Sequence, residues 1–245
     1  MAGWIAAARH LGTASLAGVI AGVVVGGLLG RIVMRLSGFT AGPGLVGVTT
    51  ANGNRVGDIT IGGTLALVIF VGLGTGVFGG FVYAIVEPWL RRVRPWHGVA
   101  YGVVLLLAFG FTVLDPSNFD FARFGVPLLN VAMFAALFVV FGLAIGWLFD
   151  ALGALREGTG AAARVVDILA WLALVPAVAV VVLFVGGAAG LDPLLAFAIV
   201  AALLVPAIVR WRGLPLAIGY AILAGALLLG AARTLSGLPS LVAGF

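Results

Sequence analysis

The sequence predicts an all-α protein that crosses a membrane several times. Of its 245 residues, 63% are hydrophobic and only 9% are charged, whereas a soluble domain carries about 25% charged residues. The mean hydropathy is +1.29, and long uncharged runs recur along the whole chain. Each run is close to the roughly 20 residues that span a bilayer as a helix. We therefore expect a single transmembrane domain over residues 1–245.

Seven apolar runs are candidate membrane spans, and short connections join them apart from residues 37–62. The runs cover residues 14–36, 63–87, 97–114, 126–150, 166–187, 192–210 and 214–233. The first four form one half, residues 1–150, and the last three, within residues 151–245, are almost purely apolar. The first run lacks a clear small-residue cleavage signal before residue 30, so we interpret it as a retained span rather than a signal peptide.

Arginine supplies all 13 basic residues, and its distribution predicts the orientation. With the N-terminus in the cytoplasm, the inner segments hold eight arginines and the outer segments five, which agrees with the positive-inside rule. The loop EPWLRRVRPWH gives the strongest cue, with three arginines. We expect a multi-pass protein of a prokaryotic cytoplasmic (inner) membrane. Because the arginines are scattered at segment ends, we expect no nucleic-acid binding despite the pI near 11.

Several kinds of chemistry are excluded by missing residue types. Without cysteine the chain can form no disulfide, thiolate metal site or iron–sulfur cluster, and without lysine no lysine Schiff base. The two histidines, His10 and His97, lie beside span ends and far apart in sequence. No protease, hydrolase, nucleotide or dinucleotide motif is found. We expect no cofactor and no metal.

A stripe of glycines runs along the first span, GVIAGVVVGGLLGRIVMR over residues 18–35. A four-residue spacing keeps residues on nearly one helical face, and small residues let helix backbones approach closely in lipid. The second span carries a matching stripe, so we expect the first two spans to pack as a pair. The same surface also suits pairing of two copies of the chain. The packing positions are Gly18, Gly22, Gly26, Gly30, Gly72, Gly76 and Gly80.

The long first loop contains VGVTTANGNRVGDITIGG. Asn52-Gly53 between runs rich in valine, threonine and isoleucine is typical of a tight β-hairpin. An isolated hairpin is marginally stable in water, so we expect a short hairpin lying on the outer mouth of the bundle. In the next outer segment, Asp115-Pro116 predicts the start of a short surface helix.

Charged and amide side chains gather in the outer segments of the first half. Arginines at one bundle mouth can pair with the nearby aspartates, or their guanidinium forks can hold a carboxylate or phosphate. This cluster is the candidate ligand site, and its members are Arg31, Arg35, Arg55, Asp58, Asp115, Asn118, Asp120 and Arg123.

Polar residues elsewhere receive structural interpretations. We expect Glu87 to form an exposed ion pair with the arginines that follow it, and Asn130 to bond across helices inside a span. Asp150, Glu157, Arg164 and Asp167 are expected to be interfacial charges on the inner side.

Three functions fit these observations. The leading hypothesis is a non-catalytic membrane component that binds a partner protein or an anionic lipid or ligand at the outer arginine and aspartate cluster. The alternative is a passive channel or small-solute transporter along the glycine-lined seam, because the span interiors lack the ionisable group that coupled transport requires. The third is an intramembrane enzyme that uses Asp115 and Asp120 as an acid–base pair.

Overall fold

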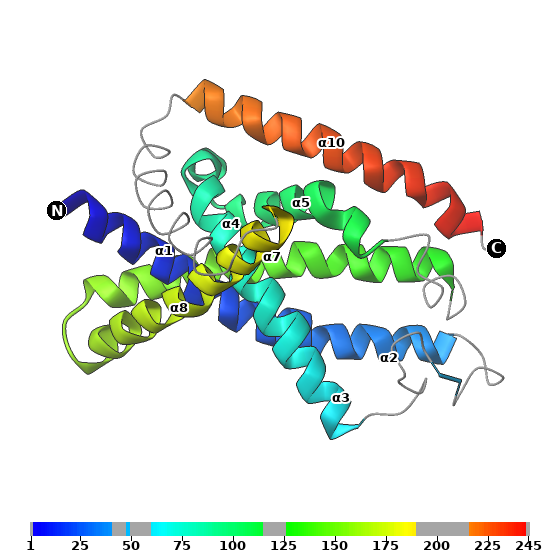
Figure 1. Ribbon diagram of the computed structural model, residues 1–245, viewed down its shortest axis with the longest axis horizontal. Helices are drawn as coiled ribbons and strands as arrows, with labels where there is room; N and C mark the ends of the chain where they lie inside the picture. The colour runs from blue at the N-terminus through cyan, green and yellow to red at the C-terminus, as the bar shows by residue number, and fades with distance from the viewer. Residues whose placement is uncertain (1, 41–47, 50–59, 115–125, 190–215, 244–245) are drawn as a thin grey trace.

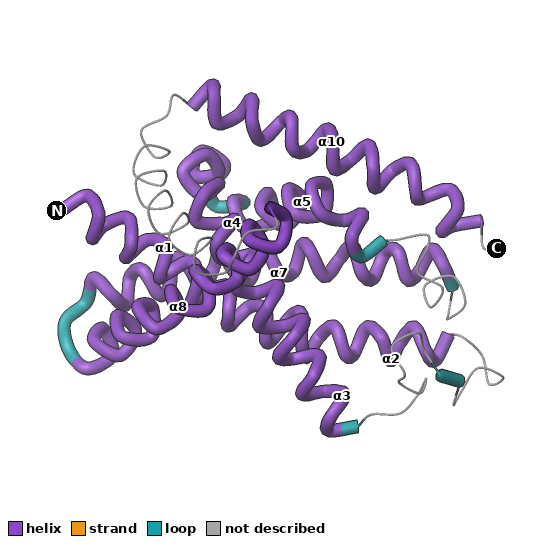
Figure 2. Tube along the Cα trace, viewed as in Figure 1, coloured by secondary structure: helices purple, strands orange, loops and turns teal. Residues whose placement is uncertain are grey.

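The computed structural model describes residues 2–40, 48–49, 60–114, 126–189 and 216–243, and nearly all of them are helical (Figures 1 and 2). Four helices are long and apolar enough to cross a membrane: Ile5–Thr40, Ile61–Val93, Pro127–Glu157 and Ala161–Val180. Two shorter apolar helices cover His97–Phe109 and Leu223–Pro239. These findings confirm an all-α membrane protein. Seven spans are not confirmed, and the predicted span 192–210 lies outside the described residues.

The predicted hairpin around Asn52-Gly53 and the predicted helix after Asp115 also lie outside the described residues. Within the described ranges the structure has no β-strand. The helical segments are longer than some of the apolar runs, since hydropathy marks the part of a helix that suits lipid and not where the helix ends. The first helix begins at Ala2, ahead of residue 14, and the predicted span 126–150 continues to Glu157.

Each of the first two helical rods contains a π-helical segment between two α-helical segments. One rod consists of α1 (Ala2–Ala21), the π-helix η1 (Gly22–Leu29) and α2 (Gly30–Thr40). The other consists of α3 (Ile61–Ala66), the π-helix η3 (Leu67–Leu73) and α4 (Gly74–Leu90). Thr60 caps the second rod, because its hydroxyl accepts a hydrogen bond of 3.0 Å from the backbone N–H of Gly63. The two π-helices pack against each other.

The rest of the bundle consists of shorter and longer helices beside these rods (Figure 1). A 3₁₀ turn, η4, links α4 to α5, and a second turn, η5, follows α5. Helices α7 and α8 are joined by a short turn, and α10 packs along α5. Their bounds are η4 (Arg91–Val93), α5 (His97–Phe109), η5 (Gly110–Thr112), α7 (Pro127–Glu157), α8 (Ala161–Ala189) and α10 (Leu216–Ala243).

Glycines of the first two rods face each other across a seam with almost no space. A Cβ atom added at Gly22 would lie 2.1 Å from the carbonyl oxygen of Gly72, and one at Gly76 would lie 2.4 Å from that of Gly18. The seam loosens along the first rod: at Gly26 the nearest atom is the Thr75 hydroxyl at 3.3 Å. We call this the first seam. At Gly30 only the rod's own backbone lies within 4 Å.

A second glycine seam joins α5 to α7. A Cβ at Gly142 would lie 2.3 Å from the backbone nitrogen of Gly102, and one at Gly98 would lie 3.0 Å from the carbonyl oxygen of Gly142. These glycines therefore let α5 and α7 touch backbone to backbone, as the first seam does for the rods. Tyr83, Tyr101 and Ile145 fill the core between the two seams.

Candidate functional site

Of the eight residues predicted to form the outer ligand site, the structure describes two, Arg31 and Arg35; the other six lie outside the described residues. Both arginines belong to α2, which buries Gly30 and Ser37 and exposes much of its other surface. The guanidinium carbon of Arg35 lies 5.2 Å from the centroid of the Phe39 ring, a cation–π contact. Arg31 is half-buried.

The opposite end of the bundle concentrates the charge of the described residues. There the start of α1, the turn between α4 and α5, and the turn between α7 and α8 come together. We call this the arginine-rich end. It holds every acidic residue that lies in the described ranges, namely Glu87, Asp150, Glu157 and Asp167, together with Arg9, Arg91, Arg92, Arg94, Arg156 and Arg164.

Glu87 forms the expected ion pair with a following arginine, Arg91, but the expectation that Glu87 is exposed was wrong. The residue is only 1% exposed, because Pro88 does not end α4 and Glu87 faces inward, one turn after the buried Tyr83. Arg91 donates a 2.6 Å hydrogen bond from Nε to Oε1 of Glu87. The imidazole Nε2 of His10 lies 3.9 Å from Oε2. A buried carboxylate within an apolar helix is a candidate functional group by default, because burying it unpaired is costly.

The two histidines, distant in sequence, lie close to the same aromatic cluster. His10 packs edge-on against Phe149 at 5.2 Å between ring centroids, and Tyr83 packs against Phe149 at the same distance. The His97 ring centroid lies 6.5 Å from that of Tyr83. His10 also donates from Nε2 to the carbonyl oxygen of Ala84 at 3.1 Å. Among the described residues no group of His, Asp and Glu has the geometry to hold a metal ion.

Several buried polar atoms of this cluster lack hydrogen-bond partners among the described residues. They are the Tyr83 hydroxyl, Oε2 of Glu87 and both ring nitrogens of His97. A buried polar atom without a partner costs roughly 1–3 kcal/mol, so such atoms normally meet water or a ligand. Tyr83 and Glu87 are four residues apart on one helical face, but no local spacing joins them to His97, so the sequence does not predict the cluster.

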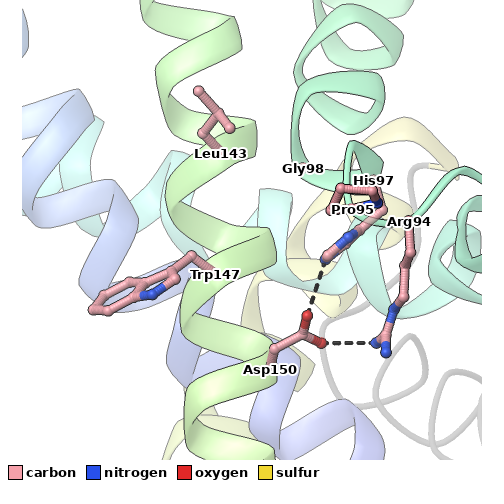
Figure 3. A pocket seen from close by; sticks show the side chains of 7 residues that line it. All are labelled: Arg94, Pro95, His97, Gly98, Leu143, Trp147 and Asp150. Carbon is pink, nitrogen blue, oxygen red and sulfur yellow. Dashed lines mark hydrogen bonds and ion pairs between the residues drawn. The ribbon is translucent and has the colours of Figure 1, made fainter.

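A cavity of about 390 Å³ opens beside His97 (Figure 3). On the wall of this cavity, the carboxylate of Asp150 lies between the guanidinium of Arg94 and the imidazole of His97. Arg94 Nη2 lies 2.8 Å from Asp150 Oδ1, and His97 Nε2 lies 3.4 Å from Oδ2. We call this cavity the α5–α7 pocket, and it is lined by Arg94, Pro95, His97, Gly98, Leu143, Trp147 and Asp150.

The second seam shapes this pocket. A Cβ added at Gly146 would lie 2.8 Å from the Cα of Gly98 and 3.1 Å from Nε2 of His97. Glycine at this position therefore allows α5 and α7 to meet and leaves room for the imidazole. Asp150 follows Gly146 by one turn of α7, which brings its carboxylate to the same face.

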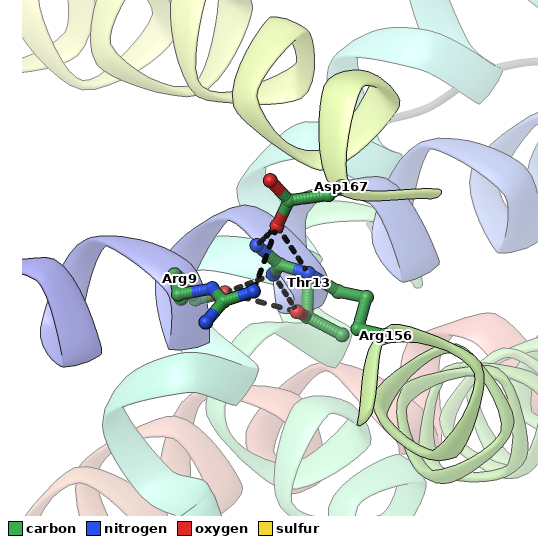
Figure 4. Close-up of polar contacts among 4 residues, drawn as sticks. All are labelled: Arg9, Thr13, Arg156 and Asp167. Atoms are coloured by element: carbon green, nitrogen blue, oxygen red, sulfur yellow. Dashed lines mark hydrogen bonds and ion pairs between the residues drawn. The ribbon is translucent and has the colours of Figure 1, made fainter. Parts of the chain in front are cut away.

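A separate network ties three helices together at the arginine-rich end (Figure 4). The Arg156 side chain is 6% exposed. Its Nε donates to Asp167 at 3.0 Å, its Nη1 donates to the backbone carbonyl of Arg9 at 2.7 Å, and Nη1 also bonds the Thr13 hydroxyl. Arg9 shares the same oxygen of Asp167 at 3.3 Å. These bonds occupy the Arg156 guanidinium, so we interpret this network as a structural clamp between α1, α7 and α8.

No protein-family model matches this sequence, and no curated protein or solved structure is significantly similar to it. The fold and the site define a helical membrane protein with a charged pocket at one end of its bundle. Any inference about function therefore rests on the pocket's own residues.

Proposed function

We propose that this chain is a non-catalytic membrane protein that binds the phosphate of an anionic phospholipid headgroup in the α5–α7 pocket. The observation that carries the proposal is the combination, in one cavity, of an oriented arginine, a buried histidine and an apolar wall. None of the lining residues carries a hydroxyl or thiol that could serve as a nucleophile.

Arg94 is suited to hold the phosphate. Asp150 engages one nitrogen of its guanidinium at 2.8 Å, and the side chain is 51% exposed. An ion pair to one nitrogen fixes the plane of the fork and leaves further N–H donors for a second anion. Arginine binds phosphate through such paired donors with charge-assisted bonds.

The apolar wall favours an amphiphile over a soluble anion. Trp147 is 70% exposed and Leu143 is 46% exposed, and both stand on the same face of α7 as the pocket. Tryptophan is enriched at the level of lipid headgroups, and leucine suits an acyl chain. A phospholipid would place its phosphate at Arg94 and its chain along Leu143 and Trp147.

The test is native mass spectrometry of the purified, delipidated protein titrated with phosphatidylglycerol in detergent. We expect Arg94→Gln to weaken binding by about 10- to 150-fold, since losing a hydrogen bond to a charged group costs about 1.5–3 kcal/mol. Arg92→Gln is the matched control, because Arg92 lies in the same exposed turn and outside the pocket wall.

Equal binding by the Arg94 variant would overturn the proposal. The double variant Arg31→Gln/Arg35→Gln tests the outer cluster that the sequence indicated; loss of lipid only there would move the site to α2. Competition by inorganic phosphate at the same affinity as the lipid would identify a soluble anion as the ligand instead.

The alternative function, a passive channel along the first seam, requires a path for solute between the two rods. A Cβ at Gly22 would meet the Gly72 carbonyl oxygen at 2.1 Å, so a solute path there requires the two rods to separate. Ion and solute flux into liposomes, abolished by Gly26→Leu, would support the channel.

A further inference from the structure

We infer that the α5–α7 pocket continues onto the η4 turn as a second phosphate subsite, so that its ligand is a phospholipid with two phosphate groups, such as cardiolipin. The inference rests on the headgroup site proposed above and names the class of lipid. Arg94 holds one phosphate, and Arg91, at the start of the same turn, holds the other.

The η4 turn places Arg91 and Arg94 on the same side. The turn is a 3₁₀ helix over Arg91–Val93, and the backbone N–H of Arg94 donates to the carbonyl oxygen of Arg91 at 3.4 Å. Side chains three residues apart in a 3₁₀ helix lie one above the other. Arg92 leaves the turn in a different direction, because each residue of a 3₁₀ helix is rotated by about 120°. The turn therefore presents the guanidinium groups of Arg91 and Arg94 together.

Both arginines are oriented in the same way, by one carboxylate at one nitrogen. Arg91 donates from Nε to Oε1 of Glu87 at 2.6 Å. Arg94 donates from Nη2 to Oδ1 of Asp150 at 2.8 Å (Figure 3). Each arginine side chain is 51% exposed. A guanidinium carries five N–H donors, so each arginine keeps donors for a phosphate after its carboxylate is satisfied.

Glu87 fixes Arg91 firmly, because the Glu87 side chain is only 2% exposed and is held within the core. Among the described residues, Nη1 and Nη2 of Arg91 make no hydrogen bond. Arg156 at the same end differs on both counts, since its side chain is 6% exposed and its nitrogens bond to Asp167, Thr13 and Arg9. Arg91 is thus an oriented cation with open donors, whereas Arg156 is already occupied.

The charge of this end suits a ligand with two negative charges. Within the described residues, the arginine-rich end holds six arginines against four carboxylates. The turn also exposes apolar side chains beside its arginines, with Val93 46% and Trp96 69% exposed, and tryptophan is enriched at headgroup level. Basic pockets between transmembrane helices bind the headgroups of cardiolipin and related lipids. A single glycerol joins the two phosphates of cardiolipin, which suits two arginines of one turn.

The experiment is native mass spectrometry of the delipidated full chain in detergent, titrated in parallel with cardiolipin and with phosphatidylglycerol. The measured quantity is the ratio of the two dissociation constants. If Arg94 alone binds phosphate, cardiolipin is favoured only about twofold, because it offers two equivalent phosphates to one subsite. We expect the native protein to favour cardiolipin by about tenfold or more, since the second phosphate adds charge-assisted hydrogen bonds.

Arg91→Gln should reduce the preference for cardiolipin to about twofold. Arg92→Gln is the matched control, because it removes the same charge from the same turn but from a different side, and it should keep the native preference. Arg91→Gln alone leaves Glu87 as a buried carboxylate without its ionic partner. The double variant Glu87→Gln/Arg91→Gln removes both charges, and it should show the same reduced preference.

A preference of the native protein near twofold would overturn this inference and leave the headgroup site standing. So would a native preference that persists in the folded Glu87→Gln/Arg91→Gln variant, or one that falls equally in Arg92→Gln, since overall charge would then account for it. Absence of binding to either lipid would overturn the headgroup site and this inference together.

Discussion

The first and second seams both pack helices through glycines, but they differ in what lies at the end of the seam. Both bring helix backbones into contact through glycine: an added Cβ would meet backbone atoms at 2.1 Å at Gly22 and at 2.3 Å at Gly142. The first seam joins two rods through apolar π-helices and continues toward Arg31 on α2. The second seam ends in the α5–α7 pocket.

The difference arises from what lies beside the glycines. In the second seam His97 directly precedes Gly98, and Asp150 follows Gly146 by one helical turn, so the close approach carries ionisable groups together. In the first seam, Ala21 and Val71 directly precede Gly22 and Gly72, and a further glycine follows each of these by four residues. Glycine contacts therefore position helices in lipid, and neighbouring residues decide whether the junction also becomes a site.

The largest expected effect comes from Gly22→Ala, which tests whether the first seam is purely structural. The new methyl would lie 2.1 Å from the Gly72 carbonyl oxygen and 2.5 Å from the Gly76 Cα. Both obstacles are backbone, so the rods must move apart. We expect the free energy of unfolding to fall by about 3 kcal/mol or more, measured by denaturation in mixed detergent micelles with circular dichroism.

Gly74→Ala is the matched control for this substitution. Gly74 lies at the start of α4, and an added Cβ there meets nothing within 4 Å, so stability should stay the same or rise slightly through helix propensity. Equal stability of the Gly22 and Gly74 variants would mean that the rods do not pack as described.

Gly146→Ala should lower stability by less than Gly22→Ala and should also weaken lipid binding. It tests whether the second seam supports both helix packing and binding. The methyl would lie 2.8 Å from the Gly98 Cα and 3.1 Å from Nε2 of His97. We expect a loss of about 1–2 kcal/mol in stability. We also expect a several-fold loss of phosphatidylglycerol affinity, because the added methyl displaces the His97 imidazole that forms part of the pocket wall.

Gly153→Ala, farther along the same helix, provides the comparison because its Cβ would meet nothing within 4 Å. It should leave binding unchanged, and stability should stay the same or rise slightly through helix propensity. If the Gly146 variant loses stability but keeps native lipid affinity, the seam and the pocket are energetically separate.

Much of the fold follows from sequence, because hydropathy and glycine spacing are local properties. The apolar runs predicted helices that the structure contains. The second seam was not predicted, because the contact between Gly142 on α7 and Gly102 on α5 depends on how the helices associate.

The candidate site was much less predictable than the fold. Glu87 follows the pattern of a helix end, with a proline and arginines after it, and only tertiary packing buries it beside His10. The α5–α7 pocket joins residues from two helices separated in sequence, His97 and Asp150, through a contact that no local spacing encodes. The outer arginine and aspartate cluster was predicted because its charges are conspicuous in an otherwise apolar sequence. Most of its residues lie outside the described residues.

The smallest expected effect comes from Gly26→Ala, which measures how far the first seam stays closed. The nearest atom to the new methyl is the Thr75 hydroxyl at 3.3 Å, and the next is the Gly72 Cα at 3.5 Å. A shift of a few tenths of an ångström relieves this contact, while alanine gains up to about 1 kcal/mol over glycine in a helix. The two effects oppose each other, so we expect a change in unfolding free energy within about 0.5 kcal/mol of zero. A loss as large as that of Gly22→Ala would show that the seam remains tight through both π-helices, and the contrast between a closed start and a looser end of the seam would fail.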